Sequence, residues 1–307
     1  MKRGLHLKRV LSRALAISLL ALNTTACIVI PPPIESNFNR GVEAYDEGKI
    51  ADAIRFYKLA LSEDPSNHFA RYNLAVAYQD QEKYDQAAEQ YQLVLKDHED
   101  TNSRINLATI LYAKGKTEEA INQLRQAAEK NPDDPNPLSV LGHYLEESGK
   151  HAKAMQAYRD ALAIDEKHAA THFRKGRLEI TMGRHNAAQD SLIKAVELDD
   201  EKPPYLELLA DHYLKHDDHL AAIDMLERVA VLESDRIEVF IRLGDLYKGL
   251  GYHRQAADRY WQALGIEPDN AYVHRMLKDM FEHLAEEERK KLDELDKTRA
   301  VAQTPSS

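Results

Sequence analysis

Histidine and cysteine are the side chains of this sequence with the greatest capacity for chemistry, because both can ligate a metal ion. His212 and His216 lie four residues apart, a spacing that puts two side chains on one face of a helix, and His219 follows three residues later. Three histidines in this arrangement could bind a transition-metal ion. Cys27 is the only cysteine among the 307 residues, so neither an intramolecular disulfide nor a cysteine-rich metal site can form.

The wider histidine spacing favours packing over metal binding. His151, His185, His219 and His253 recur at one constant interval along the chain, and Tyr84 holds the corresponding place further upstream. Because the position recurs with the repeat and also holds a tyrosine, we interpret it as an aromatic packing position at the turn of each hairpin. We therefore expect no metal site and no cofactor.

The sequence contains no arrangement that indicates catalysis. It lacks Gly-x-Ser-x-Gly, a Gly-rich phosphate loop and His-Glu-x-x-His. Carboxylates are abundant, but on an acidic helical surface they are normally solvated, so we expect no enzymatic activity. Segment 1–26 holds five basic side chains and no acidic one, which leaves 36 of the 41 Lys and Arg against 51 Asp and Glu, a net charge of −15. Such a body repels phosphate, which argues against nucleic acid as a partner.

Residues 1–26 have the pattern of a bacterial secretory signal peptide. A basic segment ends at Arg13, nine apolar residues follow over 14–22, and small and polar residues fill 23–26. Nine apolar residues are too few to cross a bilayer core, which needs about 20 in a helix.

Ala26 and Cys27 resemble the lipobox of bacterial lipoproteins, although Thr24 replaces its usual Leu. The resemblance implies that Cys27 is acylated, with palmitate among its chains, and anchors the protein to a membrane. Ile28 stands where an Asp retains related lipoproteins at the inner membrane, which implies the outer membrane and its periplasmic side. Cleavage near Ala26 without acylation is the alternative. Residues 27–33 contain three prolines and are expected to form an extended spacer.

An internal repeat with a period of about 34 residues organises most of the remaining chain. A small residue recurs at Gly41, Ala75, Ala108, Gly142, Gly176, Ala210 and Gly244. A second small position recurs at Ala53, Ala87, Ala120, Ala154, Ala188, Ala222 and Ala256. Two helices of a hairpin pack closely only where one presents a small side chain to the other. Glycines between the two helices, at 48, 115, 149, 183 and 251, suit a left-handed helix cap.

The last repeat resembles the tetratricopeptide repeat signature: Phe240-x2-Leu243-Gly244-x2-Tyr247, followed by Ala256, Tyr260, Ala263 and Pro268. The resemblance implies an all-α fold, a right-handed α-solenoid of seven helical hairpins over 34–270. The expected repeats are 34–67, 68–100, 101–134, 135–168, 169–202, 203–236 and 237–270. A capping helix is expected over 271–299 and a disordered tail over 300–307.

In tetratricopeptide solenoids the first helix of each hairpin lines a concave groove that binds protein partners. The register places Phe38, Tyr45, Phe69, Tyr72, Tyr112, Phe173, Arg177, Asp211, Lys215, Asp245 and Lys248 on that face. Its N-terminal third is aromatic and the rest is charged, with acid in excess because Glu146, Glu147 and Glu207 lie on the same face. We therefore expect a protein partner that offers an apolar or aromatic segment with basic residues. Packing between adjacent first helices would explain the same aromatics equally well.

These features together predict a non-catalytic protein–protein interaction scaffold, anchored to the outer membrane and facing the periplasm. Resemblance to lipid-anchored tetratricopeptide proteins suggests a role in assembling an envelope complex, of the type IV pilus secretin or polysaccharide export kind. An adaptor for peptidoglycan hydrolases is the alternative, and a metal- or solute-binding protein that uses His212–His219 is another. Solenoids often pair through terminal helices, so Tyr272–Leu284 is a candidate dimer seam.

Overall fold

The computed structural model of the chain describes residues 36–302, with side chains through Arg299, and this part of the chain is built of α-helices without a strand. The helices are α1 (Asn37–Asp46), α2 (Ile50–Glu63), α3 (His68–Asp80), α4 (Tyr84–Asp97), α5 (Thr101–Ala113), α6 (Thr117–Lys130), α7 (Asn136–Glu147), α8 (His151–Ile164), α9 (Ala169–Thr181), α10 (His185–Leu198), α11 (Pro203–Lys215), α12 (His219–Leu232), α13 (Ile237–Gly249), α14 (His253–Ile266) and α15 (Ala271–Ala302). The expected α-solenoid is confirmed.

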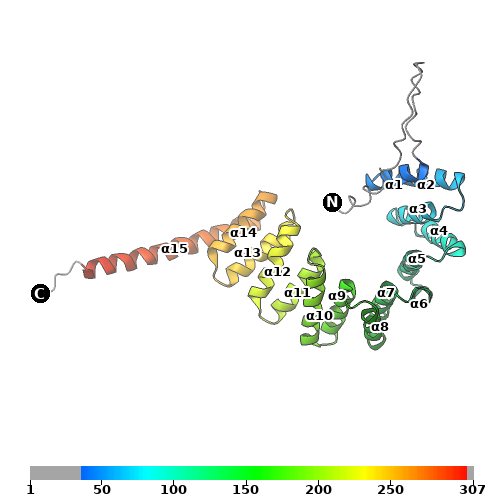
Figure 1. Ribbon diagram of the computed structural model, residues 1–307. Coiled ribbons are helices and arrows are strands. Elements are labelled where there is room, and N and C mark those ends of the chain that lie inside the picture. The colour runs from blue at the N-terminus through cyan, green and yellow to red at the C-terminus, as the bar shows by residue number, and fades with distance from the viewer. Residues whose placement is uncertain (1–35, 303–307) are drawn as a thin grey trace, which may run out of the picture.

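The helices pair into hairpins that stack along an arc (Figure 1). Each odd-numbered helix from α1 to α13 is the first helix of a hairpin, and the even-numbered helix after it is the second. First helices of neighbouring hairpins contact each other directly, as α5 does α7 and α7 does α9. In Figure 1, α3, α5, α7 and α9 lie on the inner side of the arc. The inner face, defined here as the exposed face of the first helices, is therefore the concave surface.

The turn between the two helices of a hairpin requires a left-handed residue. Gly48, Gly115, Gly149, Gly183 and Gly251 have φ between 71° and 76°, as the repeat predicts. Glu82 and Asp217 take the same place in the second and sixth hairpins, with φ of 57° and 62°. These two residues bear a cost of about 1–2 kcal/mol that glycine avoids.

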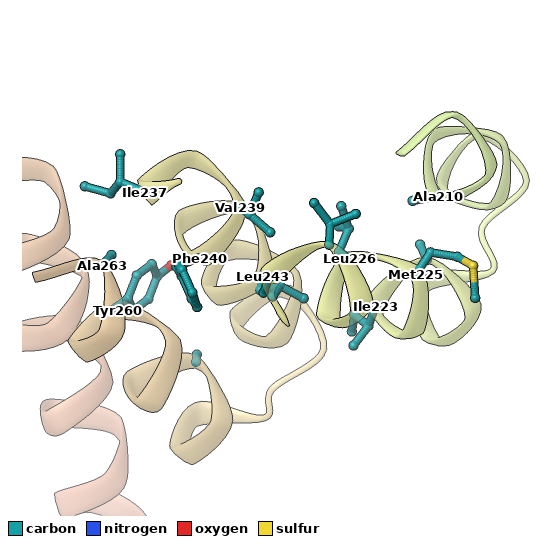
Figure 2. Close-up of a cluster of buried hydrophobic side chains, with 14 of the residues drawn as sticks. Ala210, Ile223, Met225, Leu226, Ile237, Val239, Phe240, Leu243, Tyr260 and Ala263 are labelled. Atoms are coloured by element: carbon teal, nitrogen blue, oxygen red, sulfur yellow. The ribbon is translucent and has the colours of Figure 1, made fainter. Parts of the chain in front are cut away.

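The small position of the repeat is the point of closest approach inside each hairpin. A methyl group added to Gly244 of α13 would lie 2.5 Å from the ring of Tyr260 on α14. Gly41 faces Tyr57 and Gly142 faces Tyr158 in the same way. Figure 2 shows Phe240 of α13 beside Tyr260 of α14, where both are buried. Ridges of one helix thus fill the groove left by the small residue of the other.

The last helix is longer than expected and continues to Ala302, so residues 300–302 of the predicted tail are helical. The alanines at 300 and 302 are strong helix formers, which explains the extension. The predicted signal peptide, Cys27, the proline-rich spacer and residues 303–307 lie outside the described residues. Among residues 36–302, no helix combines the length and apolar character needed to cross a membrane.

Replacing Gly244 by Ala is expected to lower the stability of the solenoid by about 1–3 kcal/mol, because the methyl group overpacks against Tyr260. Gly265→Ala in α14 is the matched control: an added methyl meets nothing within 4 Å there, and Ala favours the helix. Urea unfolding followed by circular dichroism should give a lower midpoint for Gly244→Ala only. Equal midpoints for the two variants would contradict the close contact.

The candidate docking groove

Aromatic side chains connect neighbouring first helices across the inner face. The rings of Tyr112 on α5 and Tyr144 on α7 stack with centroids 4.2 Å apart and an angle of 2° between their planes. Phe173 on α9 stacks on Tyr205 on α11, with centroids 4.6 Å apart. Tyr112 and Phe173 therefore pack between first helices, the second of the two interpretations that the sequence left open.

Three of the five predicted charged residues of the inner face form ion pairs with a neighbouring odd-numbered helix. The pairs are Arg177 with Glu146, Asp211 with Arg242, and Lys248 with Asp279. The Arg177 Nε–Glu146 Oε1 distance is 3.2 Å and the Lys248 Nζ–Asp279 Oδ2 distance is 2.7 Å. A partner that used these charges would first have to break contacts that hold the solenoid together. Lys215 is exposed at the end of α11.

Buried tyrosines of the second helices bring their hydroxyl groups to the same face. The Tyr158 hydroxyl donates to Glu146 at 2.7 Å, and the Tyr260 hydroxyl donates to Asp245 at 2.6 Å. Burial raises the pKa of both phenols, and the neighbouring carboxylates raise it further. Tyr272 of α15 also donates to Asp245, at 2.7 Å. The carboxylates thus link the core of one hairpin to its neighbour.

One part of the inner face is hollowed rather than filled. A hollow of about 200 Å³ lies between α1 and α3 and is lined by Val42, Tyr45, Asp46, Tyr57, Asn73 and Val76. Its apolar walls come from the two valines and the two rings. Its polar groups are the Asn73 amide, the exposed carboxylate of Asp46 and the hydroxyl groups of the two tyrosines.

A second carboxylate, that of Asp80 on α3, is fixed beside this hollow by the hydroxyl of Tyr45, which donates to it. Burial and this carboxylate raise the pKa of Tyr45 to about 12, so the phenol stays protonated and remains a donor at neutral pH. Asp80 itself is exposed. The hollow between α1 and α3 therefore combines apolar walls with two acidic groups.

The structure separates the predicted aromatic residues of the N-terminal hairpins. Tyr45 lines the hollow, whereas Phe38 packs on Tyr57 with ring centroids 6.2 Å apart. Tyr72 packs edge-on against Tyr91, at 5.8 Å between centroids. Phe69 is 63% exposed, with its ring next to that of His68, and lies outside the lining of the hollow.

Sequence reasoning missed most of the lining, although the repeat contains a signal for it. Val42 and Val76 are one repeat apart, as are Asp46 and Asp80. The same side chain at equivalent places of two consecutive first helices produces a matched pair on the inner face.

The histidine cluster in the structure differs from the one that the metal hypothesis named, His212, His216 and His219. His212 of α11 and His216, the residue that caps the C-terminus of α11, meet His185 of α10, with ring centroids 4.6–6.3 Å apart, and His219 is not in this stack. Among residues 36–302, no group of three or more His, Cys, Asp and Glu side chains has an arrangement suited to a metal ion. His253 likewise stacks on His283, at 4.6 Å. Two of the repeated histidines thus pack on the next odd-numbered helix, His185 at the C-terminal end of α11 and His253 in the middle of α15.

Comparison with known families agrees with this architecture of stacked hairpins. Sequence models described as tetratricopeptide repeats match residues 44–105, 105–169, 145–211 and 237–270. The chain belongs to the tetratricopeptide repeat family. A fold of this family is generally non-catalytic and serves as a scaffold for protein–protein interaction. A search among curated proteins found no match.

Solved structures share the fold at low sequence identity. A tetratricopeptide repeat protein from Parabacteroides merdae is 19% identical with a TM-score of 0.53, and the match covers 80% of this chain and 98% of that one. The C-terminal part of a repeat protein from Cytophaga hutchinsonii is 16% identical with a TM-score of 0.52, over 78% and 99%. A chain of the APC/C hetero-tetramer Cut9–Hcn1 is 16% identical with a TM-score of 0.55, over 80% and 48%. These likenesses show the fold alone.

The histidine stack should make the stability depend on pH. Burial lowers the pKa of His212 below its ordinary value of 6.5, and His216, His185 and Lys215 lower it further. Below pH 6.5 the unfolded chain therefore binds a proton that the folded chain excludes, so the free energy of unfolding falls as the pH falls. Urea midpoints measured between pH 7.5 and 5 should fall less steeply for His212→Leu than for the wild type. The exposed His98→Leu is the control, and parallel slopes for all three proteins would contradict this assignment.

Proposed function

We propose that this chain is a lipid-anchored scaffold of the bacterial outer membrane that holds a protein partner in the hollow between α1 and α3. The observation that carries this proposal is the hollow itself: on an inner face whose charges and rings are largely paired, it offers open apolar walls beside two carboxylates.

The size of the hollow favours a side chain of a protein over a free small molecule. Pockets for small molecules commonly enclose about 300–1,000 Å³. The hollow, at about 200 Å³, fits one large apolar side chain. The Asn73 amide hydrogen-bonds the Tyr57 hydroxyl, and its second N–H and its oxygen can bind a peptide backbone next to that side chain. The proposed ligand is therefore an apolar or aromatic residue within a peptide segment.

The charge of the hollow defines the residues beside that side chain. Asp46 and Asp80 are both exposed and both belong to the inner face. A Lys or Arg next to the apolar residue of the partner would pair with them, and the net charge of −15 on the chain after residue 26 adds long-range attraction for a basic segment. Binding should accordingly weaken as the salt concentration rises.

The location in the envelope rests on the sequence of the N-terminal segment. A basic, an apolar and a small-residue region precede Cys27, and Ile28 follows it. Acylation at Cys27 would tie the solenoid to the inner leaflet of the outer membrane and leave the groove in the periplasm. The clients that fit such a place are a type IV pilus secretin or a polysaccharide exporter during assembly, or else peptidoglycan hydrolases.

A pulldown from detergent-solubilised envelopes tests the hollow directly. Val42→Lys/Asp46→Lys fills it with positive charge, and Val231→Lys/Asp224→Lys makes the same two changes at exposed positions of α12 as the control. We expect the wild type and the control to retain the partner and the hollow variant to lose it at least tenfold. Equal recovery with all three proteins would refute the hollow as the docking site.

The anchor is tested separately by mass spectrometry of the protein from membranes. Acylation predicts an N-terminal peptide that begins at a lipid-modified Cys27, and Cys27→Ser should release the protein from the membrane fraction. An unmodified cysteine in a membrane-free protein would overturn the anchor and leave the docking proposal intact.

A further inference from the structure

The helix α15 continues the pattern of first helices beyond the seventh hairpin. Val273, Leu277 and Met280 are buried against the core of that hairpin. Two further contacts, Lys248 with Asp279 and Tyr272 with Asp245, extend the pairing of neighbouring first helices. The first half of α15 therefore occupies the place of the first helix of an eighth hairpin.

The side of α15 that would receive a second helix is open. His274, Lys278, Phe281 and Ala285 stand one repeat after Phe240, Gly244, Tyr247 and Gly251, which lie on the α14 side of α13 and at the turn into α14. A hollow of about 460 Å³ lies there, lined among others by Trp261, Leu277 and Phe281. Trp261 is 55% exposed and Phe281 47%, with ring centroids 6.3 Å apart. Within residues 36–302, no second helix covers this hollow.

The second half of α15 carries apolar side chains that contact no other helix in the part of the chain that the structure describes. The earlier hairpins turn at the position equivalent to Ala285, but α15 continues straight to Ala302 (Figure 1). All residues from Glu288 to Arg299 are exposed, including Leu292 at 60% and Leu295 at 59%. The open side, over 274–285, and this overhanging segment, over 288–299, are equal in length.

The two halves share one stripe of the helix. Residues 274, 278, 281, 285, 288, 292, 295 and 299 are spaced alternately four and three apart, which is the spacing of a coiled-coil seam. The second helix of a hairpin runs antiparallel to the first. We propose that two copies of this chain pair through α15 in antiparallel orientation, so that the overhang of each copy fills the open side of the other.

The pairing brings complementary side chains together at its Phe281–Leu292 layers and at its flanks. Antiparallel alignment about residues 286–287 places Phe281 opposite Leu292 of the second copy. The remaining layers of the seam are Ala285 opposite Glu288, Lys278 opposite Leu295 and His274 opposite Arg299. At the flanks the alignment places Glu282 opposite Arg289, and Arg275 opposite Asp296. Two-fold symmetry forms each pair twice. A second copy thus supplies both the apolar residues that the hollow lacks and the opposite charges at its edge.

Disulfide trapping of the full chain in detergent tests this pairing. Phe281→Cys/Leu292→Cys puts two thiols about 16 Å apart on one helix, too far for a bond within one copy. Across the seam they face each other, so mild oxidation should give a covalent dimer of twice the 35.0 kDa chain. Leu220→Cys/Val231→Cys is the matched control, with two exposed positions at the same separation on α12. The wild type shows how much covalent dimer forms through Cys27 alone.

Charge reversal provides a second, independent readout. Glu282→Arg alone and Arg289→Glu alone each set like charges against one another in both symmetric pairs, and each should raise the dimer dissociation constant about tenfold in light scattering or sedimentation. The double variant should restore the wild-type value. A monomer at all concentrations, trapping equal to the α12 control, or a double variant no tighter than the single ones would overturn the pairing. A cross-link to a different protein would also overturn it, because the open side would then have another occupant.

Discussion

The close approach of two helices at a small residue is the constraint on which the rest of this structure depends. Where α13 passes α14, the backbone of Gly244 lies so near the Tyr260 ring that a methyl group has no room. The ring therefore crosses beneath the first helix, and its hydroxyl emerges on the inner face to bind Asp245. Tyr158 and Glu146 repeat this arrangement three hairpins earlier. The small position thus sets both the packing of the hairpin and the position of a carboxylate in the groove.

The composition of the inner face follows from this constraint. Carboxylates that receive core tyrosines also bind the next first helix, as Glu146 binds Arg177, so much of the charge in the groove serves to join hairpins. The first two hairpins differ, because valines at 42 and 76 leave a hollow in place of a paired side chain. The opposite end differs for another reason: α15 has the packing of a first helix, but within residues 36–302 no second helix covers it. Open surfaces therefore remain where side chains of one hairpin are not paired with those of the next.

The repeat spacing predicted the fold well because it reports short-range geometry. Small positions, turn glycines and buried tyrosines all depend on contacts within one hairpin, and each recurs in step with the repeat. Contacts between hairpins are not encoded in that spacing. The stacking of Tyr112 on Tyr144, or of His185 on His212 and His216, depends on how much each hairpin rotates relative to the next. For groove aromatics such as Tyr112, the sequence alone therefore left docking and packing undecided. The sequence also predicts a tail from residue 300, yet the helix propensity of the alanines extends α15 to Ala302.

The proposed docking on the inner face is confined to the α1–α3 hollow. A scan with a photo-cross-linking amino acid tests this confinement most directly. The probe would replace, one at a time, the residue after each small position, which lies on the same face of all seven hairpins: Val42, Val76, Thr109, His143, Arg177, Asp211 and Asp245. After irradiation in living cells, adducts with another protein should form from positions 42 and 76 and not from 143 to 245. Adducts of similar yield from 177, 211 or 245 would contradict the account, because they would place a partner on the part of the groove that is paired with itself.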